Sequence, residues 1–272
     1  MTVWGLESVV VRLGGGPAAL DGVSLRVSPG EVAVVVGGDG AGKTTLARTL
    51  VGLESPSSGR VRRPDGRRVG YQPEGSGVWP DLTVEENLAF VAAAFRIGRA
   101  ETAERISEML AATGLGAARN RLGVELSGGM RQKLGVAMAL MAGPEMVVLD
   151  EPTTGVDPVS RFELWRLVSR SAADGTAVVM TTTYLDEAER AGTIVALDSG
   201  RMLAAGTPDE LRASVPGAVF EVERPTESTH QWRRGSSLRL WTDGSPPPGA
   251  TRIDPDLADV LVAASFAAET TG

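Results

Sequence analysis

The chain has 272 residues, which allows one large domain and a small one. Hydrophobic residues at 42% and charged residues at 22% are ordinary for a globular protein, and no apolar run approaches the roughly 18 residues that predict a transmembrane helix. The net charge of −7 argues against nucleic acid as a partner, and the absence of cysteine excludes a disulfide framework.

The predicted elements alternate between strands and helices. Runs of β-branched and apolar residues bounded by Gly and Pro predict strands, and apolar residues at helical spacing predict helices. In chain order they are strands at 3–11, 23–28 and 31–36, a helix at 43–53, turns with short strands at 55–70, a strand at 69–74, helices at 83–96, 101–112 and 128–142, a strand at 146–150, a helix at 157–174, strands at 176–181 and 193–198, and a short helix from 207. This alternation predicts an α/β fold, interrupted by a mostly helical insertion over about 75–142.

Several helix ends carry specific capping signals. Thr83 with Glu86 three residues later forms a capping box, and Asp157 precedes Pro158 at the first position of its helix. Pro144 ends the helix predicted over 128–142.

The C-terminal tail is less regular. Residues 219–222 and 238–241 predict two short strands, 246–249 is a proline-rich break, and 256–267 is an apolar helix. Two interpretations stay open: a small folded module, partly formed, or a loosely packed extension.

The strongest chemical signal is a glycine-rich loop between a strand and a helix. It fits G-x-x-x-x-G-K-[ST], in which the glycines let successive backbone N–H groups surround a phosphate. The lysine is expected to reach the β- and γ-phosphates of ATP, and the first threonine hydroxyl to ligate Mg²⁺. The predicted ATP-binding residues are Gly37, Gly38, Asp39, Gly40, Ala41, Gly42, Lys43, Thr44 and Thr45. The alternative is a glycine-rich turn without a ligand.

A second motif is the apolar strand 146–150, which ends in two carboxylates. Asp150 is placed to hold Mg²⁺, usually through water, and Glu151 to orient or deprotonate an attacking water. Alone, such a strand end is equally compatible with two solvated carboxylates. The loop upstream favours the functional interpretation.

A third motif is Ser127-Gly128-Gly129 at a helix start. A serine and two glycines before a helix suit anion binding at the helix N-terminus. They also suit an ordinary capped helix, and the residues alone do not separate these possibilities.

The order of these motifs resembles the ATP-binding subunit of ABC transporters. The resemblance covers roughly residues 3–212 and includes the segments Leu20–Leu25, Leu126–Gln132, Thr154–Asp157, Pro80–Leu88 and Tyr184–Glu189. It indicates the drug, lipid or antibiotic exporter branch, whose membrane subunits are separate chains.

The resemblance implies a P-loop NTPase core with a parallel-rich sheet, an N-terminal antiparallel β part and a small C-terminal α+β extension. The implied division is an ATP-binding domain over 1–215 and an extension over 216–272. The chain would hydrolyse ATP with Mg²⁺ at the cytoplasmic face of the cell membrane, bound to polytopic membrane subunits. The segment around Trp79 would dock on those subunits.

The resemblance also implies a second ATP-binding subunit, with two ATP molecules sandwiched between the two. Ser127, Gly128 and Gly129 would contact the γ-phosphate held by the partner, and Asp157 would lie at the dimer seam.

The sequence departs from the family around its own phosphate loop. Leu13 stands where an aromatic residue is expected to stack on adenine, and Asp39 stands where a neutral Asn is usual. Glu74 replaces a glutamine, although a carboxylate is still a suitable Mg²⁺ ligand. Thr183 occupies the position of the switch histidine, where it would act with Glu151 in catalysis. A threonine hydroxyl donates a hydrogen bond but carries no positive charge.

Three functions therefore compete. The sequence favours the ATPase subunit of an exporter, paired with an identical chain or, better, with a different and more typical ATP-binding subunit. The second function is that of a nucleotide-binding structural partner whose own site is impaired. It overlaps the first, because a transporter can contain one active and one impaired site. A soluble ABC-type ATPase that acts on DNA or ribosomes is disfavoured by the acidic charge and the single nucleotide domain.

Overall fold

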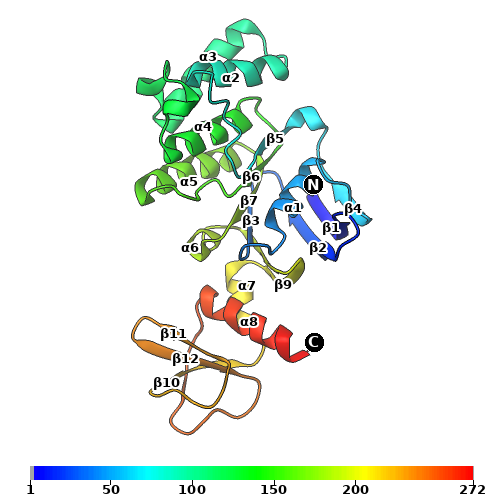
Figure 1. Ribbon diagram of the computed structural model, residues 1–272, viewed down its shortest axis with the longest axis vertical. Helices are drawn as coiled ribbons and strands as arrows, with labels where there is room; N and C mark the ends of the chain where they lie inside the picture. The colour runs from blue at the N-terminus through cyan, green and yellow to red at the C-terminus, as the bar shows by residue number, and fades with distance from the viewer. Residues whose placement is uncertain (1–2, 272) are drawn as a thin grey trace.

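A six-stranded sheet forms the centre of the computed structural model, which describes residues 3–271 (Figure 1). The strand order is β5-β6-β7-β3-β8-β9, parallel throughout except for β9, which pairs antiparallel with β8 at one edge. The strands are β3 Val32–Val36, β5 Val69–Gln72, β6 Met146–Asp150, β7 Ala177–Thr182, β8 Thr193–Asp198 and β9 Arg201–Gly206. The predicted α/β fold with a parallel-rich sheet is confirmed, whereas β9 was not predicted.

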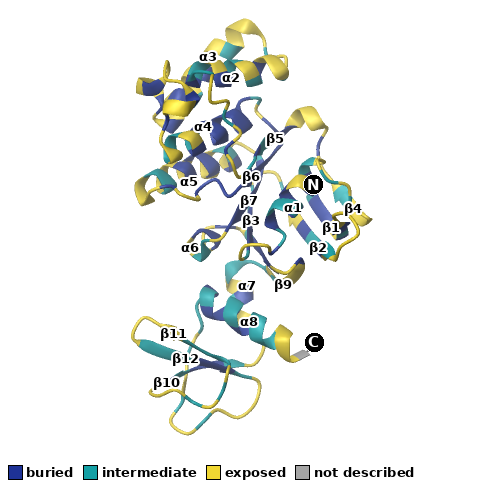
Figure 2. Ribbon diagram, in the orientation of Figure 1, coloured by how far each residue is buried: buried dark blue, intermediate teal, exposed yellow. Residues whose placement is uncertain are grey.

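Both faces of this sheet are covered, which explains why its strands are apolar along their whole length. In β3, Ala33 and Val35 pack toward α1 (Lys43–Val51), and Val34 and Val36 pack toward α5 (Pro158–Ala173). Figure 2 shows the central strands as buried, whereas the outer faces of the surrounding helices are exposed. A register shift of one residue would exchange the two faces, so the pairing of these strands is strongly specified.

An antiparallel three-stranded sheet lies on the α1 side, as predicted for the N-terminal part. Its order is β2-β1-β4, with β1 Trp4–Arg12, β2 Ala18–Val27 and β4 Ser58–Arg62. Leu6, Val9 and Leu25 join α1 and the central sheet in one apolar cluster.

Three helices between β5 and β6 form the predicted insertion: α2 Val84–Ala94, α3 Arg99–Thr113 and α4 Gly128–Leu140. They share an apolar cluster of their own, which includes Leu88, Leu110 and Leu134. The Thr83–Glu86 capping box is formed in both directions.

The tail folds into a second sheet and a helix. The sheet order is β11-β12-β10-β13, with β10 Ala218–Val222, β11 Gln231–Arg234, β12 Ser237–Thr242 and β13 Thr251–Arg252. Strands β10 and β12 were predicted, whereas the short and polar β11 and β13 were not. The short helices α6 Leu185–Ala188 and α7 Pro208–Ala213 precede this part, and α8 Leu257–Thr271 follows it. The boundary at residue 215 stays a prediction.

Helix α8 packs against two clusters at once. Leu257 and Val260 belong to the main core, and Ala263 with Phe266 packs on Trp241 of the tail sheet. Within residues 3–271 no helix is both long and apolar enough to cross a membrane.

The side chain of Asn87 fixes the segment that leads into α2. It is fully buried, accepts a hydrogen bond from the Trp79 N–H, and donates to the carbonyls of Trp79, Leu82 and Thr83. Four polar contacts thus depend on one buried amide. The three carbonyls also accept backbone N–H groups, so its loss would leave chiefly the Trp79 N–H without the partner it has here.

We therefore expect Asn87→Ala to lower the free energy of unfolding by about 2 kcal/mol or more. Urea denaturation followed by circular dichroism measures this change. The matched control is Glu104→Ala on the exposed face of α3, which should change it by less than about 0.5 kcal/mol. Equal effects of the two variants would contradict the role given to Asn87.

Candidate phosphate-binding site

The loop from β3 to α1 has the backbone conformation that its glycines make possible. A Cβ on Gly37 would lie 2.5 Å from the Leu197 carbonyl oxygen, and one on Gly42 would lie 2.8 Å from that of Ala19. Gly40 and Gly42 have φ angles of 77° and 104°, which side chains disfavour. Gly38, Asp39 and Gly40 are exposed in this turn, whereas Ala41 and Lys43 are buried.

Lys43 points back into this loop. Its Nζ donates to the carbonyl oxygens of Gly37 and Gly38, both at 2.9 Å, and lies 3.0 Å from Glu151 Oε1. The residue is 5% exposed, so its ammonium group needs these oxygens. The lysine of the loop and the carboxylate of the second motif therefore meet at one place in the fold.

The end of β6 carries the two carboxylates, and Thr181 on the neighbouring strand β7 holds both residues. Its hydroxyl donates to Asp150 Oδ1 at 2.6 Å and accepts the Glu151 N–H at 2.9 Å. Glu151 has a φ angle of 50°, a strained value for a non-glycine residue, and Thr154 Oγ1 donates to its Oε2 at 2.8 Å. Neither hydroxyl was predicted: the sequence gives no spacing signal for the contact of Thr181 between strands, and Thr154, three residues after Glu151, was noted only as part of the resemblance.

Asp150 is fully buried, and its Oδ2 has no hydrogen-bond partner in the described part of the chain. Burial raises the pKa of Asp150, while the hydroxyls of Thr181 and Thr44 lower it. A buried carboxylate with one free oxygen beside a threonine hydroxyl fits a water-coordinated Mg²⁺.

Glu74 lies in the exposed turn after β5, and its carbonyl oxygen accepts a hydrogen bond from Gln132 Nε2 at 3.2 Å. Tyr71 lies three residues before Glu74, in β5. Burial, followed by the Asp150 carboxylate and to a lesser extent Glu74, raises the pKa of the Tyr71 hydroxyl to about 12. Glu74 thus follows the strand that pairs with β6, which ends at Asp150.

The other unusual residues are exposed. Leu13 is 50% exposed at the end of β1, and Thr183 is exposed in the turn after β7. Within residues 3–271 the structure gives no hydrogen bond for the Thr183 side chain. The single histidine, His230, packs against Trp241 and Phe266 in the tail and does not replace the missing switch histidine.

The Ser127 motif begins α4, and its geometry supports both interpretations. Ser127 caps the helix by accepting the Met130 N–H at 3.2 Å. A Cβ on Gly128 would meet only the Gly155 oxygen at 3.8 Å, and one on Gly129 would have Asp157 Oδ2 at 3.8 Å. Asp157 caps α5, where the backbone N–H groups of Ser160 and Val159 lower the pKa of its carboxyl. The motif and the predicted seam residue are therefore neighbours.

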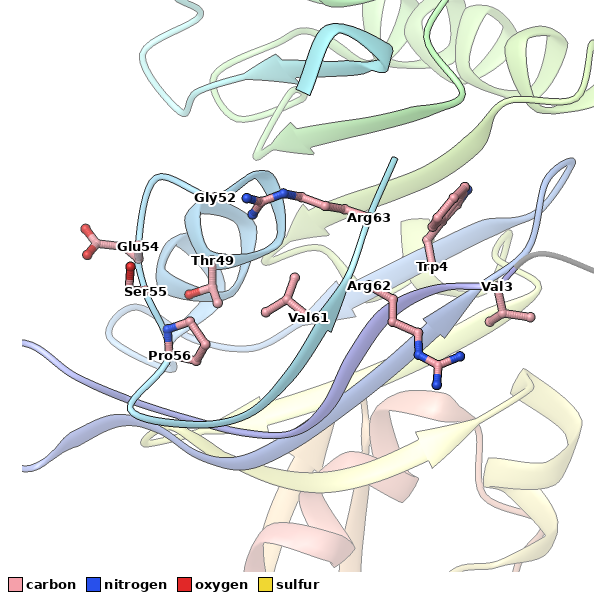
Figure 3. Close-up of a pocket in the computed structure, with 10 residues that line it drawn as sticks. All are labelled: Val3, Trp4, Thr49, Gly52, Glu54, Ser55, Pro56, Val61, Arg62 and Arg63. Atoms are coloured by element: carbon pink, nitrogen blue, oxygen red, sulfur yellow. The ribbon is translucent and has the colours of Figure 1, made fainter. Parts of the chain in front are cut away.

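A separate pocket lies between the C-terminal end of α1 and β4. Figure 3 shows the Arg63 guanidinium over Gly52, while Arg62 points away from it, and no residue of the phosphate loop lines the pocket. The two arginines of this pocket therefore do not converge on one point.

The chain is similar to known ATP-binding proteins. The family model described as ABC transporter matches residues 20–154. The daunorubicin/doxorubicin resistance ATP-binding protein DrrA of Streptomyces peucetius is 36% identical over 91% of this chain and 80% of its own length. The probable multidrug ABC transporter ATP-binding protein YbhF of Escherichia coli is 39% identical over 80% of this chain, but this chain spans only 40% of YbhF.

Solved structures agree. An ATP-binding subunit of an ABC transporter superposes with a TM-score of 0.71 at 29% identity, covering 78% of this chain and 92% of that one. A dimeric ATP-binding cassette in a post-hydrolysis state superposes with a TM-score of 0.68 over 76% of this chain and 98% of its own, and its 24% identity speaks for the fold alone. The chain therefore belongs to the ABC transporter family and contains that family's ATP-binding domain.

Proposed function

We propose that this chain binds and hydrolyses ATP to drive export through separate membrane subunits. The proposal rests on the contacts of the Lys43 ammonium group, which lies against the loop carbonyls and beside Glu151. A cation able to bind phosphate is thus next to a carboxylate able to orient water. Relatives named for drug resistance or export support the direction.

Mg²⁺ is the proposed cofactor, with Thr44, Asp150 and Glu74 as the residues that would hold it directly or through water. The unpartnered Asp150 Oδ2 and the adjacent Thr44 hydroxyl support this assignment. The bound ion would neutralise phosphate charge. The described residues contain no group of three His, Cys, Asp or Glu side chains able to hold a metal, so phosphate oxygens and water would complete the coordination.

A second ATP-binding subunit is the proposed partner at α4. Glycine is unfavourable in a helix, and no neighbour within this chain crowds the Cβ positions of Gly128 and Gly129. An exposed helix N-terminus that is not crowded by side chains suits a phosphate group brought by another chain. In that arrangement Ser127, Gly128 and Gly129 would complete the partner's site, and Asp157 would lie at the seam.

The proposed docking surface for the membrane subunit is an apolar patch on the helical insertion: Trp79, Phe90, Leu122 and Val124. The ring centroids of Trp79 and Phe90 lie 4.4 Å apart with the rings tilted against each other, and these residues are 40% and 50% exposed. The Val124 N–H donates to the Pro80 carbonyl, so the patch is continuous with the Trp79 segment. This supports a peripheral location at the cytoplasmic face of the membrane.

The partner subunit is proposed to be a different, more typical chain. On this proposal the intact signature residues Ser127 to Gly129 would serve the partner's site, whereas Leu13, Asp39, Glu74 and Thr183 would surround this chain's own loop. The Thr183 side chain is exposed and makes no hydrogen bond within the described residues, which supports slow turnover at that site. A homodimer in which Thr183 and Glu74 suffice is the alternative.

Lys43→Ala should lower ATP affinity about ten-fold or more, because a charge-assisted hydrogen bond to phosphate contributes roughly 1.5–3 kcal/mol. Isothermal titration calorimetry measures the change. The only other lysine, Lys133 of α4, pairs with Glu163 of α5 away from the phosphate loop, so Lys133→Ala is the control and should retain affinity. Unchanged affinity in Lys43→Ala would reject the assignment of the loop.

A photo-crosslinking residue in place of Trp79 or Phe90 should form a crosslink to a copurified membrane subunit, since exposed aromatic rings are frequent interface anchors. Mass spectrometry of the crosslinked peptides identifies the partner. The control position is Glu104 on α3. Crosslinks that form only through the tail would show that the docking surface is misplaced.

Thr183→His should raise the single-turnover hydrolysis rate of the purified chain, recovering part of the roughly 10²–10³-fold that one positioned polar group contributes. The rate is compared with that of the unmodified chain alone and mixed with a second ATP-binding subunit. Full transporter rates from the unmodified chain alone, abolished by Glu151→Gln, would contradict the asymmetric pairing.

A further inference from the structure

A second buried carboxylate lies next to the candidate site and has no part in the chemistry proposed so far. Glu187 of α6 is 1% exposed, and its Oε2 accepts two hydrogen bonds, from Thr153 Oγ1 at 2.9 Å and from Thr182 Oγ1 at 2.6 Å. A carboxylate is costly to bury, so a charge kept here needs these donors.

The two hydroxyls come from the two loops that bear the proposed catalytic residues. Thr153 lies two positions after Glu151, in the loop from Glu151 to Asp157 that we call the seam loop. Thr182 directly precedes Thr183, and its Oγ1 also accepts the Tyr184 N–H at 3.0 Å. One hydroxyl thus fixes the backbone on both sides of Thr183.

A third segment joins at the other oxygen. Arg161 of α5 places its Nε 3.7 Å from Glu187 Oε1 and donates from Nη2 to Asp186 Oδ2 at 2.8 Å. Its guanidinium carbon lies 4.4 Å from the centre of the Tyr184 ring. Asp157 of the seam loop caps α5, and Arg161 of the same helix contacts the turn that follows Thr183.

We propose that Glu187 is a positioning residue that joins the seam loop and the Thr183 turn into one unit. Movement of the seam loop is thereby passed to Thr183, and movement of Thr183 to Glu151 and Asp157. Among the described residues, Glu187 Oε2 is the one side-chain atom that accepts a hydrogen bond from both the seam loop and the residue before Thr183. Loss of the Thr153 or the Thr182 hydroxyl therefore breaks this connection between the two loops. The kinetic part of this inference rests on the proposed ATPase function, whereas the mechanical part does not.

Thr153→Val and Thr182→Val remove one hydroxyl each and keep the branched shape of the side chain. Hydrogen–deuterium exchange of the purified chain is then measured in peptides covering 152–157 and 183–187. Coupling predicts that each variant speeds exchange in the loop that it does not alter, by about three-fold or more. Thr176→Val is the control, because its hydroxyl bonds the Pro144 carbonyl at the opposite end of β7. Exchange that rises only in the altered loop, or rises equally in Thr176→Val, overturns the proposal.

Kinetics supply the second measurement. The two valine variants should lower the single-turnover rate about ten-fold or more, because the free energy of a hydrogen bond to a charged group exceeds that of a ten-fold change in rate. They should leave the ATP dissociation constant within about two-fold of its value in the unmodified chain. Thr153→Ser and Thr182→Ser keep the hydroxyl and should restore the rate. Failure of serine to restore it, or a parallel loss of affinity, overturns the positioning role. Lack of ATP binding by the unmodified chain would instead reject the proposed function, and the exchange data would still decide the coupling.

Discussion

The site depends on three strands that are far apart in the chain and adjacent in the sheet. Strand β7 lies between β3 and β6, with Val36 beside Thr182 and Asp150 beside Thr181. The carboxyl ends of parallel strands open at the same edge, so the phosphate loop, the carboxylate pair and the Thr183 turn emerge together. The contacts of Lys43 with Glu151 and of Thr181 with Asp150 and Glu151 follow from this adjacency, which the two-sided burial of the sheet maintains.

The same adjacency explains how a strained and highly charged edge is stable. Lys43 is surrounded by three oxygens, and Glu151 is bound at both carboxylate oxygens and at its N–H group. Strain such as the positive φ of Glu151 persists only where neighbouring contacts over-determine it. Thr181 supplies one of those contacts while it leaves Asp150 Oδ2 free.

The sequence was sufficient for those features that are set locally. The loop spacing located Lys43, and the Thr83 and Asp157 caps located two helix starts, because each signal lies within a few residues. The contacts of Thr181 with Asp150 and of Thr153 with Glu187 could not be predicted, since the partners are 31 and 34 residues apart and meet only because β6 and β7 pair. The polar strands β11 and β13 lacked the β-branched alternation that identified β10 and β12. The roles of Leu13, Asp39, Glu74 and Thr183 stay predictions, because they concern a nucleotide and a partner.

Helix α8 has a consequence for how this chain is handled in the laboratory. Its first turn completes the main core through Leu257 and Val260, beside Leu211 and the half-buried Val215. A fragment that ends at residue 215 would contain every sequence motif of the site but would lack Leu257 and Val260. The apolar groups that they cover, Leu211 and Val215 among them, would then be exposed to water and to other copies of the fragment. Such a fragment is prone to aggregate, and its poor behaviour could be mistaken for a defect in nucleotide binding.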